Sequence, residues 1–226
     1  MIIEPVQGEG GFIVPPKEYL PGLAEICRKN DMLLIVDEVQ TGFGRTGNWF
    51  AVNHFDVVPD IMTFAKSIAS GLPLSAVVGR ADVMDAPTKG RVGSTFGGNP
   101  VACVAALATL ERMEKEKLPQ KAFQIGLKLT ARMKRLQEKY HAIGDVRSLG
   151  AMVGIEFVKD PRTKEPAKDD VTAILLECSK RGLIVLGAGI FSNVIRFLPP
   201  LILTPEQLEK GISIFEEAVA AVYDKG

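Results

Sequence analysis

Two side chains of opposite charge each follow an apolar segment of this chain. Asp37 comes directly after the run Met-Leu-Leu-Ile-Val at 32–36, and Lys66 closely follows the run Ile-Met-Thr-Phe at 61–64. Short apolar runs rich in Ile, Val and Phe are typical of buried strands. Because ligands of open α/β sheets bind beyond the carboxyl ends of the strands, we expect both side chains at one ligand-binding edge.

An amine and a carboxylate at one site suit pyridoxal phosphate. The amine can bond covalently to the cofactor aldehyde, and the carboxylate can keep its ring nitrogen protonated. No other charged residue lies between Asp60 and Arg80, so we expect Lys66 to be partly buried, with the lowered pKa that a nucleophilic amine requires. The ordinary alternatives are a solvated surface lysine and an aspartate that caps a helix.

A glycine-rich segment follows at 38–47 and contains Gln40. A carboxylate, an amide and several glycines at the end of a strand favour a ligand, because glycines leave the backbone open to close approach. The glycines can instead simply shape a tight connection. Further along, the segment 94–100 leads into a predicted helix, and Thr95 could help a helix N-terminus to bind phosphate. An ordinary N-cap turn explains the same residues.

Arg196 is the one charged residue in the apolar segment 194–198, which precedes two prolines. A charge among bulky apolar residues usually has a paired anion. The guanidinium fork fits a substrate carboxylate through two parallel hydrogen bonds. The structural alternative is a salt bridge, for which Glu9 is a candidate partner. Both interpretations hold if Glu9 releases Arg196 when a substrate carboxylate arrives.

Strands and helices alternate in the first half of the chain and predict a largely parallel α/β layer. The pattern places strands at 1–3, 32–36, 61–64 and 74–78, helices at 17–30 and 101–117, and a helical turn at 50–54. A charged stretch that ends at Pro119 marks a boundary, which divides the chain into domains 1–117 and 118–226.

The second part has the pattern of a smaller α/β domain with an antiparallel sheet. It contains helices at about 120–140, 170–181 and 205–223, and short strands near 146–148, 152–158, 184–186 and 194–197.

Composition excludes several classes of function. The 27 basic and 27 acidic residues leave no basic field for nucleic acid, and two histidines argue against a His-rich metal site. No apolar run reaches transmembrane length. Three widely spaced cysteines fit the reduced thiols of a cytoplasmic protein. The start, Met-Ile-Ile, reads like the end of a buried strand, so we expect a longer polypeptide upstream.

Four motifs carry a family resemblance. They are Ile-Glu-Pro-Val-Gln-Gly-Glu-Gly-Gly at 3–11, Asp-Glu-Val-Gln-Thr-Gly-Phe-Gly-Arg-Thr-Gly at 37–47, Phe-Ala-Lys-Ser-Ile-Ala-Ser-Gly-Leu-Pro-Leu-Ser at 64–75 and Gly-Ser-Thr-Phe-Gly-Gly-Asn-Pro at 93–100. Together they resemble the class III (ω-amino acid) aminotransferases of PLP fold type I, with 4-aminobutyrate aminotransferases as the nearest kind. The resemblance implies an α/β fold: part of the large, mainly parallel-sheet cofactor domain, followed by the small C-terminal α/β domain.

The resemblance also implies cofactor roles. Lys66 would bond covalently to pyridoxal phosphate and transfer protons, and Asp37 would pair with the ring nitrogen. Gln40 would donate to the phenolic oxygen of the ring. Thr95 would reach the cofactor phosphate of the neighbouring subunit in a dimer.

Two further roles concern the substrate. Arg196 would hold the α-carboxylate of glutamate, and Glu9 would pair with Arg196 when 4-aminobutyrate, which lacks that group, is bound. The implied reaction transfers an amino group from an ω-amino acid, with 4-aminobutyrate favoured, to 2-oxoglutarate, and gives the semialdehyde and glutamate. The implied assembly is a homodimer or a dimer of dimers.

Other interpretations remain open. A related transaminase could take acetylornithine, ornithine, putrescine or β-alanine, whereas the pair of Glu9 and Arg196 argues against an aminomutase. The family carries an upstream half with a Ser-Gly-Ala type phosphate loop, an aromatic ring that stacks on the cofactor and a second substrate arginine. We therefore expect this chain to be the carboxyl-terminal half, which needs the missing N-terminal half as its partner. A non-catalytic assembly module is the alternative from a different class.

Overall fold

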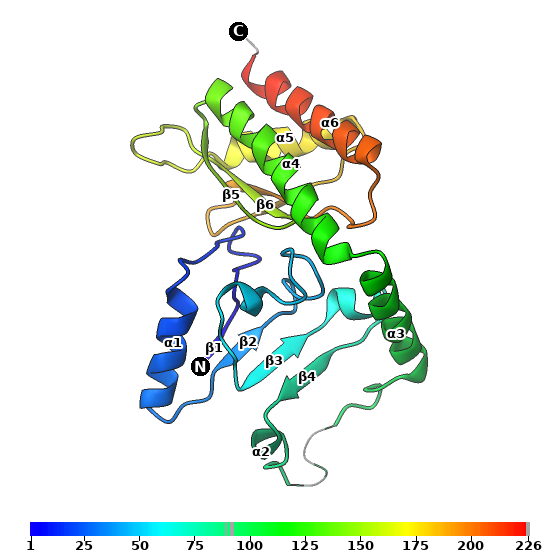
Figure 1. Cartoon of the computed structure of the whole chain (residues 1–226). Helices are drawn as coiled ribbons and strands as arrows, with labels where there is room; N and C mark the ends of the chain where they lie inside the picture. The colour runs from blue at the N-terminus through cyan, green and yellow to red at the C-terminus, as the bar shows by residue number, and fades with distance from the viewer. Residues whose placement is uncertain (89, 91–92, 225–226) are drawn as a thin grey trace. The chain divides into compact units, whose positions relative to one another are not determined.

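The computed structural model describes residues 1–88, 90 and 93–224 (Figure 1). They form two compact units. The first unit comprises Met1–Val6 and Pro15–Gln120, and the second comprises Gln7–Val14 and the chain from Lys121 onward. The short segment 7–14 therefore belongs to the second unit, far from the rest of it in sequence. The assignment of domains 1–117 and 118–226 to a cofactor domain and a small domain stays a prediction.

The first unit is built on a four-stranded sheet with the order β1-β2-β3-β4. The strands are β1 (Ile2–Ile3), β2 (Ile35–Asp37), β3 (Ile61–Phe64) and β4 (Ala76–Gly79). The first three are parallel, as predicted, and β4 is antiparallel to β3. The reversal has a simple cause, because the connection 65–75 is too short for the crossover that a parallel strand needs.

Helix α1 (Tyr19–Lys29) covers the core of this unit. It buries Leu20 and Cys27, which lie two turns apart on one face. They share a core with four buried residues in and before β2 and at the short helix 51–54: Leu34, Val36, Val52 and Phe55. The expectation that the chain starts in a buried strand is wrong for Ile2, which is 64% exposed. The reason is that β1 is the end strand of the sheet.

Short helices complete the first unit. They are η1 (Ala51–His54), η2 (Lys66–Ala69), α2 (Ala81–Met84) and the longer α3 (Pro100–Lys115). The helical turn predicted at 50–54 is therefore confirmed, whereas α2 was not expected from the sequence.

The second unit contains an antiparallel sheet, as predicted, with the order β5-β6-β8-β7. Its strands are β5 (Ile143–Leu149), β6 (Met152–Phe157), β7 (Leu186–Ala188) and β8 (Val194–Phe197). The strand predicted at 184–186 begins two residues later, and β8 has the predicted bounds.

The two faces of this sheet differ in chemistry because side chains alternate along each strand. Val146, Ile155 and Ile195 are register partners on one face and are buried. Helices α4 (Leu118–Lys139), α5 (Lys168–Lys180) and α6 (Pro205–Tyr223) supply the apolar residues of the same core. The other face carries Arg147 and Arg196.

The described residues contain neither a membrane-spanning helix nor a group of metal-ligating side chains. No helix among them is long and apolar enough to cross a membrane. Within the same residues, no three His, Cys, Asp or Glu side chains are grouped so that they could hold a metal ion.

Candidate active site

Strands β2 and β3 bring Asp37 and Lys66 to the same edge of the first sheet. The strands are parallel neighbours, and Asp37, the last residue of β2, is the register partner of Thr63. Lys66 begins η2, two residues after the last residue of β3. Asp37 Oδ1 accepts a hydrogen bond of 2.9 Å from the backbone N–H of Val39. The structure therefore places both groups at the carboxyl ends of adjacent strands.

The expectation that Lys66 is partly buried is wrong for this chain, because Lys66 is exposed. In η2 the buried positions belong to Ile68 and Ala69, so the apolar residues and not the lysine anchor this short helix. The backbone of Lys66 has a φ of 51°, in the left-handed region. That conformation costs a residue with a side chain about 1 kcal/mol, and such strain often gathers at functional sites.

A hollow of about 600 Å³ lies beside Lys66 within the first unit. Its size falls in the range of cofactor and ligand sites. The connection 65–75 and the segment 94–98 line it through Ala65, Lys66, Gly71, Leu72, Pro73, Leu74, Ser75, Ser94, Phe96, Gly97 and Gly98. Thr95 is exposed between two lining residues, and Asp37 and Gln40 are half-buried outside the lining set.

The N-terminus of α3 matches the ordinary interpretation of its sequence. Asn99 Oδ1 accepts hydrogen bonds from the N–H groups of Val101 at 2.9 Å and Ala102 at 3.4 Å. Pro100 has no N–H. The first N–H groups of the helix therefore already have an acceptor, which leaves few of them for a phosphate. The phosphate contact of Thr95 stays a prediction.

The glycine-rich loop after Asp37 is packed. The expectation of an exposed backbone is wrong for residues 41–44, which are buried. A Cβ atom on Gly42 would lie 2.8 Å from the carbonyl oxygen of Glu38, so a glycine is needed for this close approach. Phe43 packs edge-on against Phe64, with ring centroids 5.5 Å apart. The glycines therefore shape a tight connection that holds the loop containing Gln40 against the end of β3.

Glu38, the carboxylate of the glycine-rich segment 38–47, is buried, and the sequence did not predict this structural role. It accepts hydrogen bonds from the N–H groups of Ala51 at 3.0 Å and Val52 at 2.8 Å, and from the hydroxyl of Thr41. Burial raises the pKa of this carboxyl group above the ordinary glutamate value, although the three hydrogen bonds oppose the rise. The spacing of a glutamate three residues before a threonine is the only local signal. Glu38 ties the start of the loop to η1 and so supports Asp37 beside it.

In the second unit, Arg196 and Glu9 form the predicted ion pair. Arg196 Nη1 lies 2.6 Å from Glu9 Oε1. The side chain of Arg196 is only 10% exposed, whereas that of Glu9 is 75% exposed. Arg196 Nε is buried and has no hydrogen-bond partner among the described residues. Arg196 is held in the sheet, whereas the carboxylate of Glu9 is open to solvent. This arrangement suits a site where a substrate carboxylate replaces Glu9 on the guanidinium.

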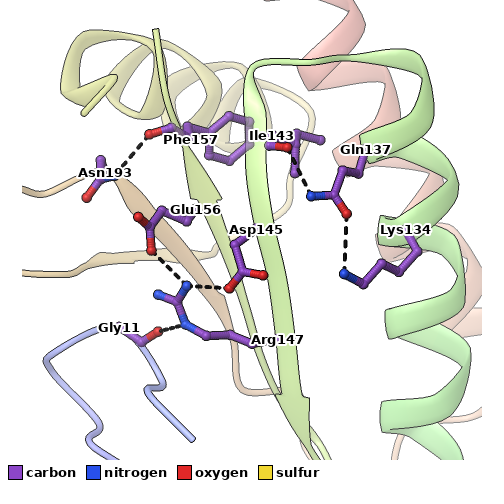
Figure 2. Close-up of polar contacts among 9 residues, drawn as sticks. All are labelled: Gly11, Lys134, Gln137, Ile143, Asp145, Arg147, Glu156, Phe157 and Asn193. Carbon is purple, nitrogen blue, oxygen red and sulfur yellow. Dashed lines mark hydrogen bonds and ion pairs between the residues drawn. The ribbon is translucent and has the colours of Figure 1, made fainter. Parts of the chain in front are cut away.

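Arg147 on β5 is a second half-buried arginine that sequence reasoning missed (Figure 2). Its Nη1 donates to Asp145 Oδ2 at 2.8 Å and to Glu156 Oε2 at 2.7 Å, and its Nε donates to the carbonyl oxygen of Gly11 at 2.9 Å. Charged residues at the alternate positions 145 and 147 of a predicted strand were the available signal.

The predicted site residues divide between the two units. Asp37, Gln40, Lys66 and Thr95 belong to the first, and Glu9 and Arg196 belong to the second.

Comparisons with known proteins all point to one enzyme family. The family model described as "Aminotransferase class-III" matches residues 1–219. A probable 4-aminobutyrate aminotransferase of Bacillus subtilis is 46% identical over 98% of this chain and 51% of its own length. The 5-aminovalerate aminotransferase DavT of Pseudomonas aeruginosa is 48% identical over 96% of this chain and 51% of its own length.

A solved structure agrees with these matches. The amine transaminase of an uncultivated Pseudomonas species, crystallised in its PLP-bound form, superposes with a TM-score of 0.91 at 39% identity. The match covers 98% of this chain and 52% of that one. The chain thus spans about half the length of the curated relatives that it matches.

Proposed function

Because the chain belongs to the class-III aminotransferase family, we propose that it forms the carboxyl-terminal part of a pyridoxal phosphate-dependent aminotransferase. The observation that carries the proposal is the placement of Asp37 and Lys66 at the carboxyl ends of parallel neighbours, with a hollow of about 600 Å³ beside Lys66. Ligands of open α/β sheets bind at such an edge.

The residues present fit the cofactor. Lys66 supplies an exposed amine beside the hollow and would hold the cofactor aldehyde. Asp37, which lies outside the hollow's lining at the end of the neighbouring strand β2, would supply the carboxylate for the ring nitrogen. When bound, pyridoxal phosphate supplies an electron sink for the substrate carbon. Asp37 would keep the proton on the ring nitrogen, because a nearby carboxylate raises the pKa of that nitrogen. Gln40 and Thr95 would hold the phenolic oxygen and the phosphate.

Lys66 has a second task in this proposal. Once substrate has displaced it, its amine would move a proton from the carbon that bears the substrate amino group. An exposed lysine on a short helix has the freedom to leave and return.

For substrates, we infer an ω-amino acid donor and 2-oxoglutarate as acceptor. The ion pair of Glu9 and Arg196 supports this, because it offers one carboxylate site that can open or close. Glutamate would displace Glu9 from Arg196, and 4-aminobutyrate would leave the pair intact. The chain is about equally similar to relatives named for 4-aminobutyrate and for 5-aminovalerate, so both donors belong in the test, beside ornithine and β-alanine.

The proposed assembly has two further parts. The missing N-terminal half would complete the cofactor site, and two copies would form a homodimer, alone or in a dimer of dimers. The three free thiols, Cys27, Cys103 and Cys178, suit a reducing compartment, so we place the enzyme in the cytoplasm.

The deciding experiment is Lys66→Ala in the full-length polypeptide that contains this sequence. We expect transamination to be abolished with every donor, because the group that bonds to the cofactor and moves the proton is gone. Borohydride reduction followed by peptide mass spectrometry should find a pyridoxyl group on Lys66 in the wild type and none in the variant.

Lys117→Ala is the matched control. Lys117 is also exposed, belongs to the first unit and has a φ of 52°. It should keep both activity and labelling. Normal turnover in Lys66→Ala, or labelling of another lysine, would contradict the proposal. A protein that carries no cofactor in either form would favour the assembly module.

A further inference from the structure

We propose that Arg147 is a positioning residue that holds the segment 8–12 so that Glu9 meets Arg196. In this way it would favour substrates that lack an α-carboxylate. The inference rests on the proposed function of the pair of Glu9 and Arg196. It adds a residue that touches neither the substrate nor the cofactor and acts through the main chain.

The first support is the set of contacts that Arg147 makes (Figure 2). Its Nη1 donates to both Asp145 and Glu156, at 2.8 Å and 2.7 Å, whereas its buried Nη2 has no hydrogen-bond partner among the described residues. Its Nε then donates to the carbonyl oxygen of Gly11 at 2.9 Å. The side chain is 15% exposed. A guanidinium fixed by two carboxylates is therefore a rigid anchor for the backbone at Gly11.

The second support is the register of the sheet. Gly154 on β6 pairs with Arg147 on one side and with Arg196 on the other, so both arginines flank it on the same face. A Cβ atom on Gly154 would lie 3.0 Å from the carbonyl oxygen of Gly11. The segment 7–14 thus lies directly on the sheet at this glycine, between the two arginines.

The third support is the rigidity of the segment. Gln7 and Ile13 exchange backbone hydrogen bonds of 3.1 and 3.2 Å, which close it into a loop. Within the loop the N–H of Gly11 donates to Gly8 at 3.1 Å. Glu9 lies inside this turn, two residues from the carbonyl that Arg147 holds. The carbonyl oxygen of Glu9 also accepts a hydrogen bond of 3.0 Å from the N–H of Gly189, so Gly189 and Arg147 together hold the backbone that presents Glu9.

The variant Arg147→Lys tests whether Arg147 acts through the shape of its guanidinium or only through its positive charge. Arg147→Lys keeps the positive charge beside Asp145 and Glu156, but it lacks the planar fork that serves both carboxylates and the Gly11 carbonyl together. We expect the variant to fold, with its segment 8–12 less firmly held. Arg196 would then lose its internal partner more often.

The test compares single-turnover half-reactions of the full-length enzyme. Arg147→Lys should slow the 4-aminobutyrate half-reaction about fivefold, the size expected when one hydrogen bond is lost, and should change the glutamate half-reaction less than about twofold. Arg132→Lys is the matched control, because Arg132 on α4 also pairs with two carboxylates, but these belong to Glu209 and Glu216 of α6 and not to the segment 7–14. It should leave the ratio of the two half-reaction rates unchanged.

Hydrogen exchange gives a readout that needs no turnover. In Arg147→Lys the amides of residues 8–13 should exchange faster, whereas those of β6 should not. Asp145→Asn removes one carboxylate that orients the guanidinium and should act in the same direction with a smaller effect, which keeps the proposal testable if the lysine variant does not fold.

The outcomes are distinct. Equal losses in both half-reactions, or unchanged exchange at residues 8–13, would overturn the role of Arg147. Failure of the proposed function would appear in the wild type itself, as an absence of transamination with every donor, and would remove the basis of the substrate effect while the exchange experiment still reports on the anchor.

Discussion

The two units present their charged site residues in different ways. In the second unit, the side chains of Arg196 and Arg147 are mostly buried on one face of a sheet, and carboxylates lie within 2.6–2.8 Å of each. In the first unit, Lys66 is exposed beside a hollow. In the second unit, ion pairs within the unit hold the charged side chains in place. In the first unit, the parallel direction of β2 and β3 brings Asp37 and Lys66 to the same edge of the sheet.

The first unit also buries an ionisable group, but this group, the carboxyl of Glu38, is not one of the predicted site residues. Glu38 lies next to Asp37 in sequence and is fully enclosed by the loop that it ties together. The difference is that the proposed cofactor lysine, Lys66, is exposed, whereas the carboxyl group next to the half-buried Asp37 is enclosed by the loop that it secures.

The largest effect that tests this comparison should come from Arg196→Lys in the full-length enzyme. For the proposed substrates, the glutamate half-reaction should slow by about tenfold to a hundredfold, because a lysine cannot replace the two parallel bonds to a carboxylate. The 4-aminobutyrate half-reaction should lose much less. Single-turnover rates measure both, and equal losses would show that Arg196 does not distinguish the two substrates.

A smaller effect is expected from Glu38→Ala, measured as the free energy of unfolding in urea. It should fall by about 2 kcal/mol, because three buried donors lose their acceptor. Lys117→Ala again serves as the control and should change little. A loss below about 0.5 kcal/mol, the range of ordinary surface substitutions, would mean that Glu38 does not secure the loop.

The pH dependence sharpens the same contrast. The pKa of Glu38 is raised in the folded chain. Protonated Glu38 therefore stabilises the folded state at low pH, and this contribution is lost as the pH rises from 4.5 through the raised pKa. The stability of the wild type relative to Glu38→Gln should therefore fall with rising pH. At the C-terminal end of α5, Arg181 and Lys180 lower the pKa of Glu177 to about 2. Glu177→Gln should therefore show the opposite sign, with a loss of stability that is greatest above pH 4.5 and vanishes toward pH 2.

The smallest effect concerns the backbone of Lys66. Lys66→Gly should be more stable than Lys66→Ala by about 1 kcal/mol, because glycine adopts a positive φ without strain. Urea unfolding of the two variants measures the difference. Equal stabilities would indicate that the left-handed conformation at Lys66 carries no strain, and the contrast between the units would then rest on exposure alone.

Local sequence alone determined much of this protein. The apolar runs before Asp37 and Lys66 located β2 and β3, and hydrophobic periodicity located β8 and α6 with their observed bounds. The isolated charge of Arg196 predicted an anion partner, and Glu9 was among the candidates. These features follow from propensity and pattern within a few residues, which the chain itself carries.

Tertiary structure decided the rest. It brought the segment 7–14 into the second unit, it gave Arg147 its carboxylates and the carbonyl of Gly11, and it left Lys66 exposed while Glu38 was buried. Each of these outcomes depends on which distant segments cover a residue. Burial and pairing across 100 residues or more, as between Gly11 and Arg147, are properties of packing that no local pattern encodes.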